Sequence, residues 1–105
     1  MAEAQAKKGD VVVAEKTYET WTARYETRQT TKYLVRWVHS ATRDGTVKEL
    51  ADHTGTREDR SKFGRIWVAD GKLFDAEKLN SVIREHWDGF DSYEEARNAV
   101  MAAKK

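Results

Sequence analysis

The residue types between Trp21 and Lys48 have the chemistry to bind nucleic acid. This stretch carries six lysines and arginines and four large aromatic residues, but only two acids. Cations contact phosphates and exposed rings stack on bases, so basic and aromatic residues interleaved on neighbouring strands are typical of a nucleic-acid surface. Trp21 and Tyr25 lie near an expected strand end, whereas Trp37 and Trp67 occupy regular apolar positions and are expected in the core.

A second group of cations follows along the chain. Three basic residues surround the Asp44-Gly45 pair, and four more lie in residues 57–65. If the later segment folds back beside the earlier one, these cations form one cationic rim. Acids are interspersed throughout, so the alternative is a solvated face of weak ion pairs, each worth about 0–1 kcal/mol. The residues predicted to bind nucleic acid or a partner are Arg36, Arg43, Lys48, Arg57, Arg60, Lys62, Arg65, Trp21 and Tyr25.

The sequence offers no constellation for catalysis or metal binding. The chain has no cysteine, which excludes a thiol nucleophile, a disulfide and a thiolate metal site. Its three histidines, His39, His53 and His86, fall in different expected elements, and no Gly-x-Ser-x-Gly motif is present. Residues 53–57 combine hydroxyls, a glycine and a cation, but they lack the glycines and the Lys-Ser/Thr pair of a phosphate-binding loop. We therefore predict no enzyme, no metal and no cofactor.

Charge and hydropathy limit the kinds of partner. Up to Lys72 the chain has 14 basic and 11 acidic residues, and from Leu73 it has 5 and 7, so the basic surplus is small and belongs to the first part. Proteins that bind duplex DNA by neutralising phosphates are usually more basic, and we expect a local patch at most. The lack of cysteine and of a long apolar run predicts a cytoplasmic protein that does not bind membranes.

Apolar spacing predicts a β-rich first part of the chain. Residues 1–8 are expected to be a disordered tail. The Asp44-Gly45 pair suits a tight hairpin, because both residue types tolerate a positive φ. The expected strands are 11–21, as one strand or two, 33–39, 47–50, 66–68 and 72–74. The expected connections are a turn at 28–31, a long charged loop at 52–64 and a second tight turn at Asp70-Gly71.

The hydrophobic period changes after Phe74. Asp75 is a good helix N-cap, and Leu79, Val82 and Ile83 follow at helical spacing through residues 76–87. A second helix begins after Asp91 or Ser92, with Glu94 and Glu95 in its first turn and an apolar face of Tyr93, Ala96, Val100 and Ala103. Neither helix can bury its stripe alone, so we expect both to close over one face of the sheet.

The entry Gly9-Asp10-Val11-Val12-Val13, the meander after it and the Asp44-Gly45 hairpin resemble a small SH3-like barrel, including the class found in KOW-type domains of transcription and translation proteins. The resemblance covers roughly residues 9–74 and implies binding to RNA, ribosomal surfaces or polymerase. The expected fold class is α+β, a small antiparallel β-meander or SH3-like barrel of about five strands followed by two C-terminal helices. Residues 9–105 form one domain, β-rich over 9–74 and helical over 75–103. The mix of charged residues, Trp and Thr is also similar to small proteins of actinobacteria and their phages.

Two functional hypotheses follow. The first is a small non-enzymatic module that binds nucleic acid, or a nucleoprotein or transcription machine, through the basic hairpin and loop. The second is a protein-interaction module, such as a phage or mobile-element factor that docks on a host protein, or a homodimer formed through an exposed strand edge or Trp. The first is the leading hypothesis. The near-neutral net charge and the abundance of Trp and Tyr motivate the second, because these aromatics are common at interface hot spots.

Overall fold

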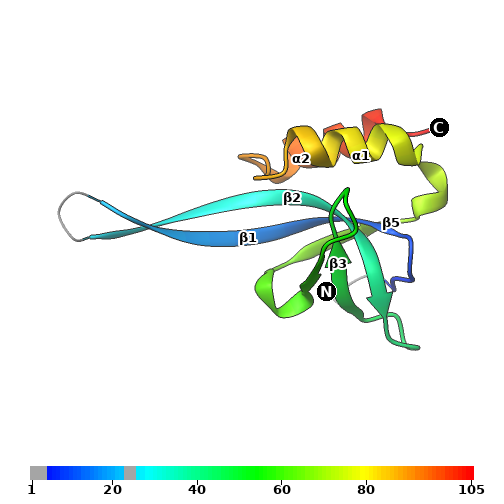
Figure 1. The fold of residues 1–105 in the computed structure, drawn as a ribbon, viewed down its shortest axis with the longest axis horizontal. Helices are drawn as coiled ribbons and strands as arrows, with labels where there is room; N and C mark the ends of the chain where they lie inside the picture. The colour runs from blue at the N-terminus through cyan, green and yellow to red at the C-terminus, as the bar shows by residue number, and fades with distance from the viewer. Residues whose placement is uncertain (1–4, 23–25) are drawn as a thin grey trace.

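The fold is a five-stranded antiparallel sheet with two helices packed on one face (Figure 1). The computed structural model describes residues 5–22 and 26–105. The elements are β1 (Val11–Trp21), β2 (Thr27–Ala41), β3 (Val47–Ala51), β4 (Arg57–Asp59), η1 (Arg60–Lys62), β5 (Ile66–Ala69), η2 (Gly71–Leu73), α1 (Ala76–Glu85) and α2 (Tyr93–Ala102). The prediction of an α+β layout with two C-terminal helices is confirmed.

The strand order in the sheet is β4-β3-β2-β1-β5. The first four strands form a meander of hairpins, and β5 returns to pair with β1. β1 therefore lies between two neighbours, and residues 11–14 are buried on both faces. This position explains the continuous apolar run of three valines, because a strand that is covered on both faces has no solvent side to alternate with.

Two apolar cores lie on the two faces of the sheet. Alternation along β1 sends Val11 and Val13 to the face covered by the helices, and Val12 and Ala14 to the opposite face. On the helix side they meet Val35, Phe74, Leu79, Ile83, Ala96, Val100 and Ala103. On the other side they meet Ala6, Leu34, Val38, Val47, Leu50 and Phe63.

β1 and β2 extend well beyond their neighbours in the sheet. β5 covers β1 only over residues 11–14, and β3 pairs with β2 only from Trp37 onward. The remaining part, Lys16–Trp21 with Thr27–Lys32, is a two-stranded ribbon that projects from the body (Figure 1). We call this ribbon the arm. It makes the molecule elongated, with principal extents of 47 × 28 × 27 Å.

The predicted turn at residues 28–31 is wrong. These residues lie within β2, where Arg28 pairs with Thr20 and Thr31 with Thr17. Threonines favour extended backbone, and the segment has no glycine, asparagine or proline to reverse the chain. The reversal comes earlier, where the Thr22 amide donates to the Glu26 carbonyl at 2.8 Å.

The predicted charged loop at residues 52–64 is also wrong, because it contains β4 and η1. A tight turn joins β3 to β4, and in it the Asp52 carboxylate accepts hydrogen bonds from the amides of Thr54 and Thr56 at 2.8 and 3.1 Å. Gly55 supplies the positive φ of 88° that this turn needs. All three residues of β4 are charged, so the strand has no apolar pattern to reveal it.

Two smaller expectations are corrected at the edges of the sheet. Residues 71–73 form η2 rather than a strand, and Asp70 caps this short helix by accepting from the Lys72 amide at 3.0 Å. The disordered tail predicted over 1–8 is wrong for residues 5–8: Ala6 is buried and its amide donates to the Gly45 carbonyl at 2.9 Å. Residues 1–4 lie outside the described part of the chain.

The local signals for the hairpin and the helices are confirmed. Gly45 adopts a φ of 92° between β2 and β3. The Asp75 side chain caps α1, and the Ser92 hydroxyl accepts from the Glu95 amide at 3.2 Å to cap α2. Within the described residues, neither helix has the length and apolar character that a membrane span requires.

Candidate functional site

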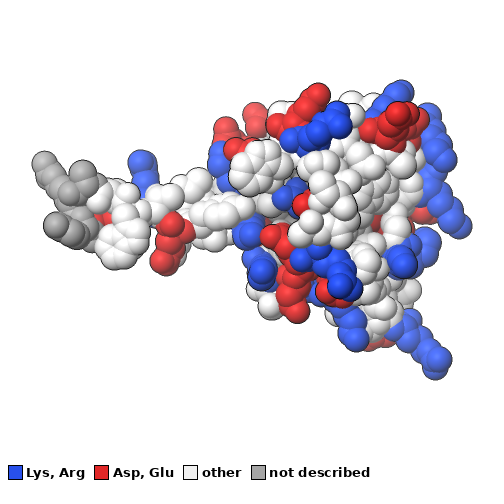
Figure 2. All heavy atoms as spheres, viewed as in Figure 1, with Lys and Arg blue, Asp and Glu red and all other residues white. Residues whose placement is uncertain are grey.

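The structure brings two cations of the predicted rim together, but acids lie among them. Lys48 and Arg60 line a shared hollow beside β3 and β4, but Glu49 and Asp59 line it with them. Figure 2 shows the same mixture more widely, with basic and acidic side chains interspersed over the visible face of the body. A phosphate approaching this hollow would meet as many carboxylates as cations.

Arg36 differs most from its predicted role. Its side chain is buried on the sheet face opposite the helices, with 7% of its surface exposed. The guanidinium donates to the carbonyls of Val35 and Trp87, both at 2.8 Å. Burial lowers the pKa of Arg36 below its usual value, against the opposing effect of the carboxylates of Glu58 and Asp52. Arg36 therefore holds the α1–α2 connection against β2, and its predicted place in an exposed rim is wrong.

The other predicted binding residues are spread over the molecule. Arg43 lies at the tip of the β2–β3 hairpin, Arg57 on β4 and Lys62 in η1, and all three are exposed. Trp21 is 74% exposed at the end of β1, as expected for a ring near a strand end. Tyr25 lies outside the described residues. Arg65 reaches a different feature, a pocket on the helix side of the sheet.

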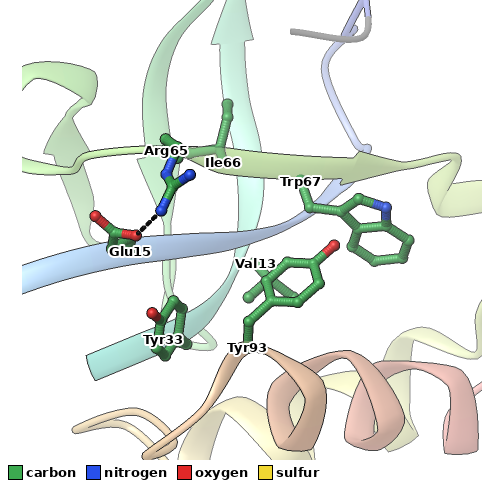
Figure 3. Close-up of a pocket in the computed structure, with 7 residues that line it drawn as sticks. All are labelled: Val13, Glu15, Tyr33, Arg65, Ile66, Trp67 and Tyr93. Carbon is green, nitrogen blue, oxygen red and sulfur yellow. Dashed lines mark hydrogen bonds and ion pairs between the residues drawn. The ribbon is translucent and has the colours of Figure 1, made fainter. Parts of the chain in front are cut away.

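This pocket lies between the sheet and the start of α2, and its walls are aromatic (Figure 3). Its volume is about 400 Å³. Its lining residues are Val13, Glu15, Tyr33, Arg65, Ile66, Trp67 and Tyr93, and we call it the aromatic pocket.

Four elements position these side chains. Alternation along β1 places Glu15 on the same face as Val13, one step beyond the apolar core, and Glu15 pairs across the ladder with Tyr33 of β2. Trp67 pairs with Val13 from β5. The Ser92 cap fixes the start of α2, and Tyr93 is the first residue of that helix. The pocket therefore forms only when β1, β2, β5 and α2 are assembled.

The Tyr93 ring stands nearly perpendicular to the other two rings. Tyr93 makes edge-to-face contacts with Tyr33 at 6.3 Å between ring centroids and with Trp67 at 6.4 Å, with interplanar angles of 79° and 89°. Tyr33 is held further by two backbone hydrogen bonds with Phe90, of 2.8 and 2.9 Å. Perpendicular rings present both faces and edges to one space, and ring faces attract cations.

Glu15 gives the aromatic pocket a negative charge. Its main chain is fixed to the start of β5 by hydrogen bonds from the Gly64 amide at 2.6 Å and to the Arg65 carbonyl at 2.9 Å. Its carboxylate, 24% exposed, lies 3.5 Å from the guanidinium of Arg65. The Arg65 side chain is 92% exposed, so this ion pair is weak and easily exchanged.

A cation already lies against one wall of the pocket from outside. The guanidinium carbon of Arg97, on α2, lies 5.5 Å from the centroid of the Trp67 ring. Within about 6 Å a cation is attracted by the ring quadrupole. The protein's own side chains therefore place one cation at the Trp67 ring and a second at Glu15.

The histidines do not converge on a second site. His86 ends α1 and stacks on Phe90 at 4.2 Å between centroids, while His39 and His53 lie on β2 and in the β3–β4 turn. Among the described residues, no three His, Asp or Glu side chains gather where they could hold a metal ion.

Sequence reasoning missed most of the aromatic pocket. Trp67 packs against the helix-side core as predicted, but it is only partly buried, and Tyr93 at the start of α2 is 37% exposed; both line the pocket. The predicted binding residues do not include Glu15. The alternation of Val11, Val13 and Glu15 is the signal that could have identified it, because it places a carboxylate on a buried face.

Comparison of the chain with protein-family models, with curated proteins and with solved structures finds no match.

Proposed function

We propose that the protein is a non-catalytic protein-interaction module that binds a lysine side chain of its partner in the aromatic pocket. One observation carries this proposal: three aromatic rings, Tyr33, Trp67 and Tyr93, stand around a space that also contains the Glu15 carboxylate. Rings that face a desolvated cation attract it by about 0.5–2 kcal/mol each, and a carboxylate adds a charge-assisted hydrogen bond.

A lysine fits this pocket better than an anionic ligand does. The ammonium can approach Glu15 while the methylene stem packs on the rings, and methylated ammonium groups suit aromatic walls equally well. A phosphate would be repelled by Glu15. The pocket therefore favours the protein-interaction hypothesis over the nucleic-acid hypothesis, which the dispersed cations of the hairpin and loop support less well.

The proposal is tested with a labelled peptide that carries one central lysine. We expect saturable binding by fluorescence anisotropy, with a Kd in the micromolar to millimolar range, because the rings and the carboxylate together supply several kcal/mol and this range corresponds to about 4–8 kcal/mol. A peptide with norleucine in place of lysine has the same stem without the charge, and its affinity should be at least about tenfold lower.

Two pairs of variants locate the binding. Glu15→Gln should weaken lysine binding about tenfold, whereas Glu49→Gln, which removes the same charge from β3, should leave it unchanged. Trp67→Leu should also weaken binding, and Trp87→Leu, at a tryptophan that is 68% exposed elsewhere, should not. Circular dichroism confirms that each variant is folded. Equal affinity for lysine and norleucine peptides, or binding to RNA or DNA that Glu15→Gln does not alter, would contradict the proposal.

A further inference from the structure

The edge of β1 is open directly beyond the aromatic pocket. The ladder between β1 and β5 ends at Glu15, whose amide and carbonyl both bond to residues 64–65. β1 continues to Trp21, and among the described strands only β2 pairs with it there, along its other edge. Unpaired strand edges are templates for another strand, and natural proteins usually cover them.

The direction of the backbone groups on this edge is defined. Because Glu15 bonds toward β5, alternation directs the amides and carbonyls of Thr17 and Glu19 toward the same open side. Tyr33, the partner of Glu15 across the ladder, likewise bonds outward, to Phe90. The intervening residues Lys16 and Tyr18 bond toward β2, so the open edge offers its hydrogen bonds at alternate residues.

The two faces of the arm differ in charge. The face shared with Glu15 carries Glu19, Trp21 and Gln29 together with three threonines, and none of these described residues is a cation. The opposite face carries Lys16, Arg28 and Lys32 and no acid within the described strand residues. A segment lying along the open edge would therefore meet an acidic and aromatic face on the side of the pocket, which complements a basic segment.

We propose that an extended, lysine-bearing segment of a partner protein adds as a strand to the edge of β1 from Thr17 to Trp21, with the lysine opposite Thr17. This inference rests on the proposed function and specifies how the partner binds. Main-chain hydrogen bonds to Thr17 and Glu19 supply affinity, and the aromatic pocket selects the lysine, which is the usual division of labour in strand addition.

The spacing of a β-ladder agrees with this arrangement. Residues directly opposite each other share a face, so the lysine side chain would leave the added strand on the face of Thr17 and Glu15. Diagonal neighbours on one face lie about 7–8 Å apart, within reach of a long side chain. The ammonium would then reach Glu15 and displace the exposed guanidinium of Arg65.

Amide hydrogen exchange of the intact protein tests the inference. The probes are short peptides of alternating threonine and valine with one lysine near either end, because residues 64–65 already occupy the edge of β1 at Glu15. At a peptide concentration about ten times its Kd, exchange at Thr17 and Glu19 should slow about tenfold, because their amides become bonded in the complex. Exchange at Lys16 and Tyr18 should not change comparably, since their amides already face β2.

Backbone methylation of the probe gives a second, independent readout. N-methylation of the lysine and of the residue two positions away, opposite Glu19, removes the amides that face β1, and we expect at least a tenfold loss of affinity. N-methylation of the intervening residues removes only amides that face away, and affinity should be retained.

The outcomes separate this inference from the proposed function. Binding that depends on Glu15 but protects neither Thr17 nor Glu19, or that tolerates both methylation patterns equally, would overturn strand addition and leave the pocket as the binding site. Protection of Thr17 and Glu19 that rises with protein concentration in the absence of peptide would assign the edge to a second copy of the chain. Failure of every lysine peptide to bind would overturn both proposals.

Discussion

Glu15 converts an apolar hollow into a site for a cation. Three rings alone would also accept flat or aliphatic groups, because the burial of apolar area stabilises any such group whether or not it is charged. The Glu15 carboxylate lies beside the rings, and hydrogen bonds between the Glu15 main chain and residues 64–65 fix its position. It adds an attraction that depends on the charge of the ligand and that orients the ligand's cation. The site therefore depends on one carboxylate. Its ion-pair partner Arg65 is exposed, so a cationic ligand can displace it.

Arg65 competes with the ligand for Glu15. Its removal should therefore raise the affinity for a lysine peptide, whereas Glu15→Gln and Trp67→Leu should lower it. Arg65→Ala removes the competing guanidinium, so we expect the affinity for a lysine peptide to rise about twofold to fivefold, consistent with a weak exposed ion pair. Fluorescence anisotropy measures the change. Lys62→Ala, which removes an exposed cation from η1, is the matched control and should have no effect. Weaker binding by Arg65→Ala would show that Arg65 contacts the ligand itself.

The residues of the aromatic pocket were only partly predictable. Trp67 and Tyr93 were correctly placed on apolar faces, because alternation and helical spacing are local signals. Their exposure at a pocket depends on how far α2 lies from β5, and no pattern within either segment determines that distance. The same limit applies to Arg36, which is buried and donates to the carbonyl of Trp87, a residue far along the chain.

Among the elements of the fold, the turns and helix caps were easier to predict from the sequence than the strands. The β2–β3 hairpin was predicted from Asp44 and Gly45, and both helices from their caps. β4 was missed because a short, fully charged edge strand lacks an apolar pattern. Its position depends on the Asp52 side chain, which closes the preceding turn. Aspartates that accept from the second following amide are a recognised turn signal, and Asp52 was not interpreted in that way.

The Asp52 turn should make stability depend on pH. Burial raises the pKa of Asp52, but the hydrogen bonds from Thr54 and Thr56 outweigh burial and hold the pKa below its usual value. The ionised carboxylate therefore stabilises the fold above the unfolded-state pKa of about 3.9, and this contribution is lost as the pH falls through the lower folded-state pKa.

Removing the carboxylate should expose that dependence. Asp52→Ala should lower the free energy of unfolding by about 1–2 kcal/mol at neutral pH, since three hydrogen bonds are lost. The difference from the unmodified protein should shrink as the pH falls below the unfolded-state pKa of about 3.9 and through the lower folded-state pKa. Urea unfolding at several pH values measures it, with Asp88→Ala as the control at an exposed aspartate. A destabilisation that is independent of pH would contradict this role.

The whole molecule consists of a body with two cores and a projecting arm. The body is closed where two segments that are distant in the sequence meet: the Asp10 carboxylate is buried and accepts from the amides of its neighbour Lys7 and of Gly71, at 3.0 and 3.2 Å. The arm has no core of its own, and isolated two-stranded hairpins are only marginally stable in water. The body therefore carries the stability, and the arm presents its edges and faces to solvent.

A substitution at Gly71, in this junction, tests whether the body carries the stability of the fold. A Cβ added at Gly71 would lie 1.9 Å from the Gly9 carbonyl oxygen, so Gly71→Ala must separate two packed backbones. We expect a loss of about 3 kcal/mol in the free energy of unfolding, measured by urea denaturation. Gly55→Ala is the matched control: its φ of 88° strains an alanine, but no atom lies within 4 Å, and the expected loss is about 1 kcal/mol. Equal losses of stability in the two variants would contradict this prediction, because they would show that the backbones at Gly71 separate at little cost.

The measurement that tests the central proposal most directly is an NMR titration with a peptide carrying one trimethyl-lysine. The proposal predicts intermolecular nuclear Overhauser effects from the N-methyl protons to the ring protons of Tyr33, Trp67 and Tyr93, which enclose the aromatic pocket. These effects should weaken in Glu15→Gln at the same peptide concentration, because the attraction between the trimethylammonium and the carboxylate is removed. Saturable binding with Overhauser effects to other rings, such as Trp21 or Trp87, and none to the pocket would contradict the proposed function.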